Sequence, residues 1–158
     1  MNIELGLNRK TVKDIRNLLV PQPITARKAD CIEDIFKKLS NDLRIRNIYV
    51  VDENNKLVGA VRMNMTLEYL FPLTSLVEMG GNFREGGVPK LSATGMVSDI
   101  MNPNPRYVTE EQTLSEVAKI FLREKITELP VVDSEMNLIG QVNSTEIIVA
   151  YLNSKYTE

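Results

Sequence analysis

The stretch "LPVVDSEMNLIGQV", residues 129–142, repeats the pattern of "IYVVDENNKLVGAV", residues 48–61. Each copy has a pair of valines followed by an aspartate, a polar turn, and a second apolar run that contains a glycine. Two short β-branched runs around a polar turn are typical of an antiparallel hairpin. The sequence therefore predicts one hairpin in each half of the chain.

An amphipathic helix is predicted in front of each hairpin, at residues 30–40 and 113–124. Both segments place apolar side chains at the i, i+3, i+4, i+7 spacing of one helix face. Both also begin with a residue that can cap the helix, followed three positions later by a glutamate, which is the spacing of a reciprocal capping box. The predicted capping pairs are Asp30 with Glu33 and Thr113 with Glu116.

Each copy is completed by a lead-in and a closing helix. The lead-ins begin with "VKDI", residues 12–15, and "VSDI", residues 97–100, and continue into stretches that proline keeps out of a helix. Closing helices are predicted around residues 66–71 and 144–152. The expected order in both copies is therefore strand, helix, strand, strand, helix.

This organisation predicts a mixed α/β (α+β) fold built from two repeats. The first repeat covers residues 1–71, and the second covers residues 96–158. Residues 72–95, which contain two Gly-Gly pairs and a proline, are expected to form an inter-repeat linker or an ordered functional loop. A chain of 158 residues can bury one ordinary core, whereas neither repeat has enough apolar faces to stand alone. We therefore expect the repeats to fold together as one module.

Composition narrows the possible classes of function. The net charge of −2 favours neither nucleic acid nor an anionic membrane as a partner, and no apolar run approaches a membrane span. The absence of histidine removes the usual general base and the commonest metal ligand, which argues against an enzyme. The sequence thus predicts a cytoplasmic, non-catalytic protein with no required cofactor and no metal site. Cys31, among apolar helix positions, is expected to be small, buried and inert.

The repeated hairpin string, the "V-x-D-I" lead-ins and their order together resemble a tandem pair of CBS domains, the cystathionine-β-synthase-type regulatory module. The resemblance covers nearly the whole chain outside the linker. It implies two β-α-β-β-α repeats packed about a pseudo-twofold axis, with clefts that hold adenosine-containing ligands such as AMP, ADP, ATP or S-adenosylmethionine. It also implies a homodimer, an effector protein whose identity is unknown, and no catalysis. The apolar run "TEIIVAYL", residues 145–152, independently favours a helix that is covered on more than one side.

The resemblance also implies a ligand marker after the hairpin glycine: two apolar residues, Thr or Ser, two variable residues, then an Asp that accepts the ribose hydroxyls. The second repeat reads "GQVNSTE", residues 140–146, with Asn143 at the hydroxyl position and Glu146 at the carboxylate position. The first repeat reads "GAVRMNM", residues 59–65, and places Met65 at the carboxylate position. Because a thioether is a weak acceptor, the ligand is expected mainly at the second repeat.

The resemblance also implies apolar residues around the adenine, which here are Tyr107, Val108, Leu129 and Pro130. Thr145 at the helix start is a further candidate, as are Arg62 and Arg106, because a guanidinium group matches phosphate. Each assignment has an alternative. Asn143 and Glu146 have the spacing of a capping pair that needs no ligand, the apolar residues fit a plain core, and the arginines fit solvated charges. A ligand-independent dimerisation or interaction scaffold is therefore the alternative function.

Overall fold

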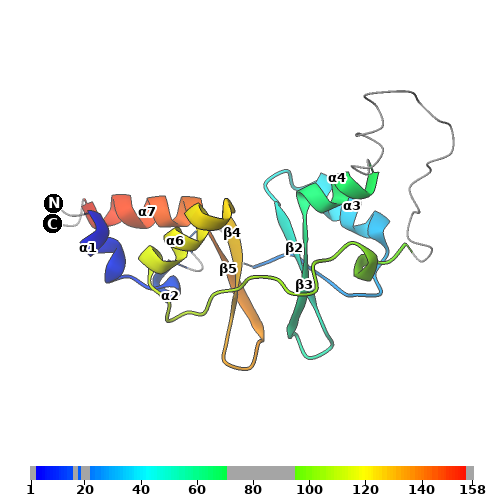
Figure 1. Cartoon of the computed structure of the whole chain (residues 1–158), viewed down its shortest axis with the longest axis horizontal. Helices are drawn as coiled ribbons and strands as arrows, with labels where there is room; N and C mark the ends of the chain where they lie inside the picture. The colour runs from blue at the N-terminus through cyan, green and yellow to red at the C-terminus, as the bar shows by residue number, and fades with distance from the viewer. Residues whose placement is uncertain (1–2, 16–17, 19–21, 71–94, 156–158) are drawn as a thin grey trace. The chain divides into compact units, whose positions relative to one another are not determined.

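The computed structural model describes residues 3–15, 18, 22–70 and 95–155. The chain forms two compact units (Figure 1). Unit 1 contains Met1–Pro23, Glu53–Leu57 and Arg106–Glu158, and unit 2 contains Ile24–Asp52 and Val58–Pro105. The predicted linker, residues 72–95, lies outside the described residues except for Gly95. None of the described helices is long and apolar enough to cross a membrane.

Unit 2 holds the hairpin of the first repeat. Strand β2 (Asn47–Val51) lies between β1 (Thr25–Ala26), which is parallel to it, and β3 (Leu57–Arg62). Helices α3 (Ile32–Asn41) and α4 (Met63–Leu70) lie side by side (Figure 1), where the rings of Phe36 and Tyr69 are 6.3 Å apart. This confirms the predicted order of elements in the first repeat. The buried core is formed by Ala26, Ile35, Leu39, Ile48, Val50, Val61 and Val97.

Unit 1 holds the hairpin of the second repeat. Strands β4 (Glu128–Val132) and β5 (Leu138–Asn143) form an antiparallel pair. Helices α6 (Leu114–Glu124) and α7 (Ser144–Lys155) contact each other, and α1 (Ile3–Asn8) contacts both helices. The predicted first strand of this repeat is reduced to one parallel bridge between Val108 and Val131. The core contains Val12, Ile15, Val108, Leu114, Val117, Phe121, Leu129, Val131, Val142, Ile147 and Ala150.

The two amphipathic helices begin differently. Helix α6 has the predicted capping box, because Thr113 N–H donates to Glu116 Oε2 at 2.7 Å and Glu116 N–H donates to Thr113 Oγ1 at 3.2 Å. The predicted cap of α3 is wrong: its N-cap is Cys31, and Asp30 instead accepts from the backbone of Arg27. Cys31 is exposed rather than buried, because it precedes the apolar stripe, which begins at Ile32.

The lead-ins are exchanged between the units. Helix α2 (Val12–Ile15), from the first repeat, lies in unit 1, where Val12 N–H donates to Gln112 O at 3.0 Å. The short 3-10 helix η1 (Val97–Asp99), from the second repeat, lies in unit 2, where Val97 N–H donates to Asp30 O at 2.9 Å. Val12 and Val97 are both fully buried. The core of each unit is therefore completed by the repeat that is not its own, so sequence repeats and compact units do not coincide.

The turns of the two hairpins pair within unit 1. Leu138 N–H donates to Asn55 O at 3.0 Å, and the Asn55 side-chain amide donates back to Leu138 O at 3.0 Å. Leu57 N–H donates to Met136 O at 2.9 Å. Asn55 and Met136 hold the equivalent left-handed position of each turn, with φ of 62° and 68°. Asparagine tolerates this conformation through its short polar side chain, whereas methionine does not favour it.

The glycine of the first hairpin is explained by a close backbone approach in unit 2. A Cβ at Gly59 would lie 2.7 Å from Met101 Sδ and 3.2 Å from Asn102 O. The neighbouring Ala60 exchanges both backbone hydrogen bonds with Asn102, at 3.0 and 2.8 Å. Gly59, which the two hairpins share in sequence with Gly140, thus makes room for the lead-in of the second repeat at Met101 and Asn102.

Candidate functional site

The predicted ligand marker of the second repeat lies where β5 passes into α7. Ser144 N–H donates to Thr127 O at 2.9 Å, which ties the helix start to the residue before β4. Asn143 N–H donates to Glu146 Oε2 at 2.7 Å, and Glu146 N–H donates to Asn143 Oδ1 at 2.9 Å. The two residues therefore form the reciprocal cap that the sequence offered as the alternative to a ligand contact.

Exposure distinguishes the residues of this junction. Glu146 is fully buried, Asn143 is half-buried and Thr145 is exposed. Thr145 and Asn143 are therefore accessible to a molecule at the start of α7, whereas Glu146 is buried and hydrogen-bonded to Asn143. The first helical turn also supplies backbone N–H groups and the positive end of the helix dipole, which suit an anionic or polar ligand.

The equivalent junction of the first repeat, in unit 2, is built on the same plan with different chemistry. Met63 N–H donates to Arg46 O at 3.0 Å, as Ser144 N–H does to Thr127 O. Arg62 N–H approaches the Met65 sulfur at 3.4 Å, in the place of the Asn143–Glu146 contact. A neutral thioether thus caps the strand end where the second repeat has a carboxylate. Arg62, the last residue of β3, is half-buried and belongs to unit 2.

The four apolar residues predicted around an adenine separate into two groups. Val108 and Leu129 belong to the buried core of unit 1. Successive side chains of a strand point to opposite faces, so Pro130 lies on the face of β4 opposite to the one that carries Leu129. Tyr107 is 43% exposed. Pro130 is buried as well, so Tyr107 is the exposed member of the four, while Val108 and Leu129 fit the plain-core alternative.

Gln141 is a residue that sequence reasoning missed. It is the cross-strand partner of Pro130 in the β4–β5 pair, and it is 7% exposed. Cross-strand partners project from the same face of a sheet, so Gln141 and Pro130 are neighbours there. The only signal in the sequence was a polar residue inside the apolar run of residues 138–142.

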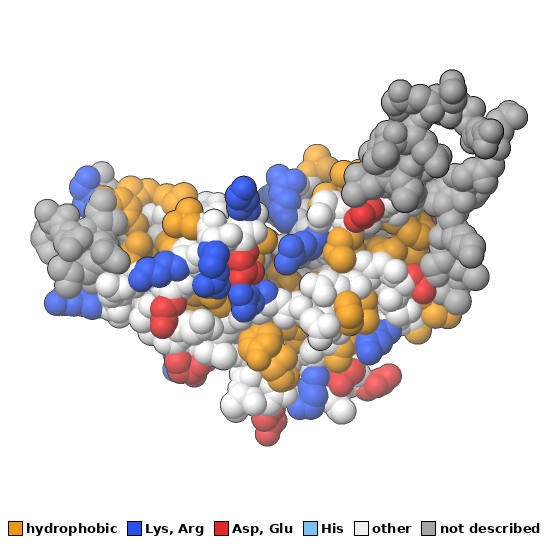
Figure 2. Space-filling view, in the orientation of Figure 1, with side chains coloured by type: hydrophobic (Ala, Val, Ile, Leu, Met, Phe, Trp, Pro, Cys, Tyr) orange, Lys and Arg blue, Asp and Glu red, His pale blue; other side chains and the backbone are white. Residues whose placement is uncertain are grey.

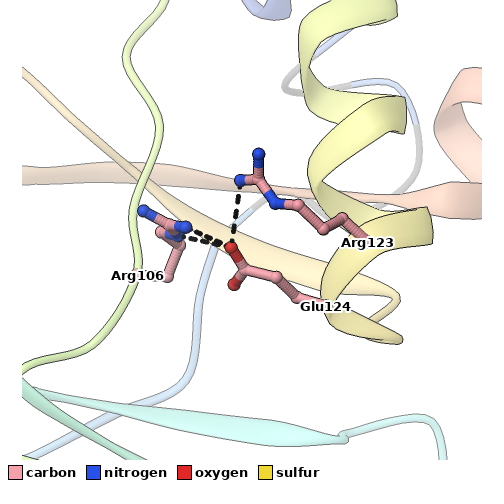
Figure 3. A network of polar contacts seen from close by, with 3 residues as sticks. All are labelled: Arg106, Arg123 and Glu124. Carbon is pink, nitrogen blue, oxygen red and sulfur yellow. Dashed lines mark hydrogen bonds and ion pairs between the residues drawn. The ribbon is translucent and has the colours of Figure 1, made fainter.

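Arg106 takes part in a charged cluster at the end of α6 (Figure 3). Its Nε donates to Glu124 Oε1 at 2.9 Å, a second guanidinium nitrogen contacts the same oxygen, and Arg123 donates to it at 3.2 Å. The hydrogen bond from Arg106 lowers the pKa of Glu124 and raises the pKa of Arg106 itself. Two cations share one carboxylate, so the cluster carries a net positive charge.

The surface around this cluster is basic. On the face in view, Figure 2 shows Lys and Arg side chains gathered near the end of α6, with acidic side chains among them. The Arg106 side chain is 49% exposed and that of Arg123 is 66% exposed, whereas Glu124 is 25% exposed. The guanidinium groups, rather than the carboxylate, are therefore the part of the cluster that solvent and solutes meet.

Comparison with known proteins identifies the architecture. The CBS domain family model matches residues 12–71 and 97–153. The chloroplastic CBS domain-containing protein CBSX1 of Arabidopsis thaliana is 30% identical over 128 residues, which cover 71% of this chain and 52% of that protein. The chain spans less than two thirds of the length of that protein and of two other curated relatives, the magnesium transporter MgtE of Thermus thermophilus and CBSX2 of Arabidopsis thaliana.

Two solved structures resemble the chain over most of its length. CBSX2 of Arabidopsis thaliana in complex with AMP aligns with a TM-score of 0.71 at 25% identity, over 92% of this chain and 98% of that one. The CBS domain pair of protein MJ0100 in complex with 5′-methylthioadenosine and S-adenosyl-L-methionine aligns with a TM-score of 0.68 at 25% identity, over the same shares. These matches confirm the predicted mixed α/β (α+β) fold and the resemblance to paired CBS domains. The chain therefore belongs to the CBS domain family and carries two CBS repeats.

Proposed function

We propose that this chain is a regulatory module that senses an adenosine-containing ligand, such as AMP, ADP, ATP or S-adenosylmethionine, mainly at its second repeat. The ligand changes the surface that the module presents to an effector protein, and no reaction is catalysed. Relatives whose solved structures hold AMP, or S-adenosylmethionine and 5′-methylthioadenosine, support the ligand class.

The observation that carries this proposal is the junction of β5 and α7. It brings the exposed Thr145 and the half-buried Asn143 to the start of a helix of 12 residues. Tyr107 supplies exposed apolar surface, the buried Pro130 lies on the face of β4 opposite to Leu129, and Arg106 supplies a cation for phosphate. Glu146 is the proposed acceptor for the ribose hydroxyls, and because its side chain is fully buried against Asn143, this contact requires the ligand to open part of the cap. The first repeat lacks that carboxylate, since Met65 replaces it.

Thermal unfolding in the presence of candidate ligands tests the proposal. AMP, ADP, ATP and S-adenosylmethionine are compared with GMP, which has the same ribose and phosphate on a different base. A ligand at 100 times its Kd adds about 2.7 kcal/mol to the free energy of unfolding, which is a clear shift in the midpoint. We expect at least one adenosine ligand to raise the midpoint and GMP to have little effect. No shift with any adenosine ligand contradicts the proposal.

The alternative function, a scaffold that needs no ligand, is favoured by one observation. The side chains at both marker positions, Glu146 and Met65, are used as caps within their own repeats.

With either function we propose a homodimer, because α7 leaves the apolar side chains of Ile148 and Leu152 57% and 42% exposed. Apolar residues on the outer side of a helix favour a protein contact there. The cytoplasmic location stays a prediction from the sequence.

A further inference from the structure

We propose that one side of α6 docks an acidic segment of a partner protein, an inference that rests on the proposed effector protein and not on the adenosine site. We call this surface the α6 basic face and define it as Arg106, Lys119, Leu122 and Arg123. Lys119, Leu122 and Arg123 are exposed, and spacings of three and four residues make them neighbours on the helix. Arg106 joins them through Glu124, which also contacts Arg123 (Figure 3).

The positive charge of this face is not needed to hold the helix. In α3, the equivalent helix of the first repeat, Lys38 of the last turn is half-buried and donates to Thr25 O at 2.7 Å, so it is used within the fold. In α6, Arg123 of the last turn is 66% exposed and donates to Glu124, a carboxylate that Arg106 already contacts. Exposed ion pairs of this kind contribute little to stability. The second arginine therefore adds charge to the surface without a corresponding structural need.

The same positions of the first repeat have different chemistry. Counted from the first residue of each helix, Ser40 and Asn41 of α3 stand where α6 has Leu122 and Arg123. The next position carries a carboxylate in both cases. Among the described residues, the carboxylate after α3 contacts one arginine, whereas the carboxylate of α6 contacts two. The exposed leucine and the excess positive charge are thus particular to the second repeat and are not features of the fold.

A protein segment that carries carboxylates beside an apolar side chain fits this face. Guanidinium groups match carboxylates through paired hydrogen bonds, and clusters of arginines are a recurring means of binding acidic segments. Leu122 is 80% exposed and adjoins both Lys119 and Arg123 on the helix. An apolar side chain of the partner can therefore cover the leucine while carboxylates on either side of it meet the cations.

Nucleic acid and anionic membranes fit the face less well. A phosphate backbone supplies negative charge but leaves Leu122 in contact with water. The net charge of −2 for the whole chain also opposes attraction to an extended anionic surface, because that attraction depends on the summed charge. Recognition here depends on a local group of cations around one apolar side chain, which is the scale of a short protein segment.

NMR titration of the isotope-labelled full chain tests the surface directly. The probe is a short capped peptide in which leucines alternate with aspartates. Two control peptides have serine in place of leucine, or lysine in place of aspartate. We expect the leucine–aspartate peptide to shift the backbone signals of Lys119, Leu122 and Arg123, and to leave those of Lys37 and Ser40 on α3 unchanged. The lysine peptide should not bind, and added salt should weaken the leucine–aspartate peptide, because exposed charges are screened.

Variants separate the charged contact from the apolar one. Arg123→Gln should weaken the leucine–aspartate peptide about three- to tenfold, because a charge-assisted contact is lost. Leu122→Ser should weaken this peptide by a similar factor and leave the serine peptide unaffected, since only leucine can cover Leu122. Lys37→Gln is the matched control. It removes an exposed cation of α3 at the helix position equivalent to Lys119, and it should leave both affinities unchanged.

The outcomes that overturn the inference are distinct from those that test the adenosine site. Absence of shifts on α6, or an unchanged affinity in Arg123→Gln, overturns the docking surface and leaves the adenosine site intact. A thymidine oligonucleotide or phosphatidylserine vesicles that bind more tightly than the peptide, with the same loss in Arg123→Gln, overturn the protein partner in favour of a phosphate-bearing one. Because the titration contains no nucleotide, failure of AMP to bind leaves this inference standing.

Discussion

Asn143 and Glu146 cap each other: the Asn143 N–H donates to the Glu146 carboxylate at 2.7 Å, and the Glu146 N–H donates to the Asn143 side-chain oxygen at 2.9 Å. The corresponding contact in the first repeat joins Arg62 N–H to the Met65 sulfur at 3.4 Å. The same backbone thus accepts a strong anionic cap in one repeat and a weak neutral cap in the other. A carboxylate can accept several hydrogen bonds, whereas a thioether is a weak acceptor.

Substitutions at Glu146 separate a ligand contact from a cap. Glu146→Gln keeps a side chain that can cap and removes the charge. If the carboxylate accepts ribose hydroxyls, charge-assisted hydrogen bonds worth about 1.5–3 kcal/mol are lost, and calorimetry should report about ten- to a hundredfold weaker binding of AMP. Glu146→Ala should weaken AMP similarly and also reduce stability by about 1 kcal/mol through loss of the cap.

Met65 provides the matched control for this series. Met65→Ala should leave the affinity for AMP almost unchanged and affect mainly the packing of unit 2. Equal binding of AMP by the unmodified protein and both Glu146 variants, alongside reduced stability of Glu146→Ala, shows that the carboxylate is a cap only.

The contact between Arg106 and Glu124 predicts a pH dependence. Because Arg106 lowers the pKa of Glu124 in the folded state, the contact contributes stability above the unfolded pKa of about 4.3 and loses it as the pH falls through the folded value. Arg106→Gln should therefore raise the Glu124 pKa in an NMR titration. Its difference in stability from the unmodified protein should be largest near pH 6 and shrink toward pH 2. A difference that is constant over this range means that the arginine stabilises the protein by packing alone.

The exchanged lead-ins predict that neither half of the chain folds alone. Residues 1–95 lack Val97 and Met101, which pack in unit 2, and residues 96–158 lack Val12 and Ile15, which pack in unit 1. Circular dichroism should show each half to be unfolded or aggregated, whereas the two halves mixed should recover cooperative unfolding. Within the full chain, Val12→Ala and Val97→Ala should each reduce stability by about 2 kcal/mol, because both remove a fully buried side chain. An isolated half that unfolds cooperatively shows that the exchange is dispensable.

The outer side of α7 predicts the dimer contact. Ile148→Asp places a charge on an apolar residue that is 57% exposed, so it should leave the folded unit intact and weaken association. Light scattering should report a dimer for the unmodified protein and a species of 17.9 kDa for the variant. Leu122→Asp on α6, at a residue 80% exposed, is the control and should remain dimeric. A monomeric unmodified protein at micromolar concentration contradicts the proposed homodimer.

The sequence by itself determined the local elements and their order. Both hairpins, the helix with the Thr113–Glu116 cap, and the helix that begins at Ser144 depend on residues close together in the chain. Their patterns of apolar residues, turns and caps are therefore readable from a short window. The Cys31 prediction was wrong because a helix boundary also depends on backbone contacts with distant segments: the helix begins at Ile32, which leaves Cys31 off the buried stripe and paired with Met96.

Tertiary structure alone decided which segments share a core and which polar groups have partners. The exchange of Val12 and Val97 between units depends on backbone pairing across most of the chain, and no local pattern encodes it. The same is true of Gln141, which is 7% exposed although glutamine is usually found at the surface. Periodicity describes one element at a time, whereas burial and hydrogen bonding are properties of the surroundings that the whole fold creates.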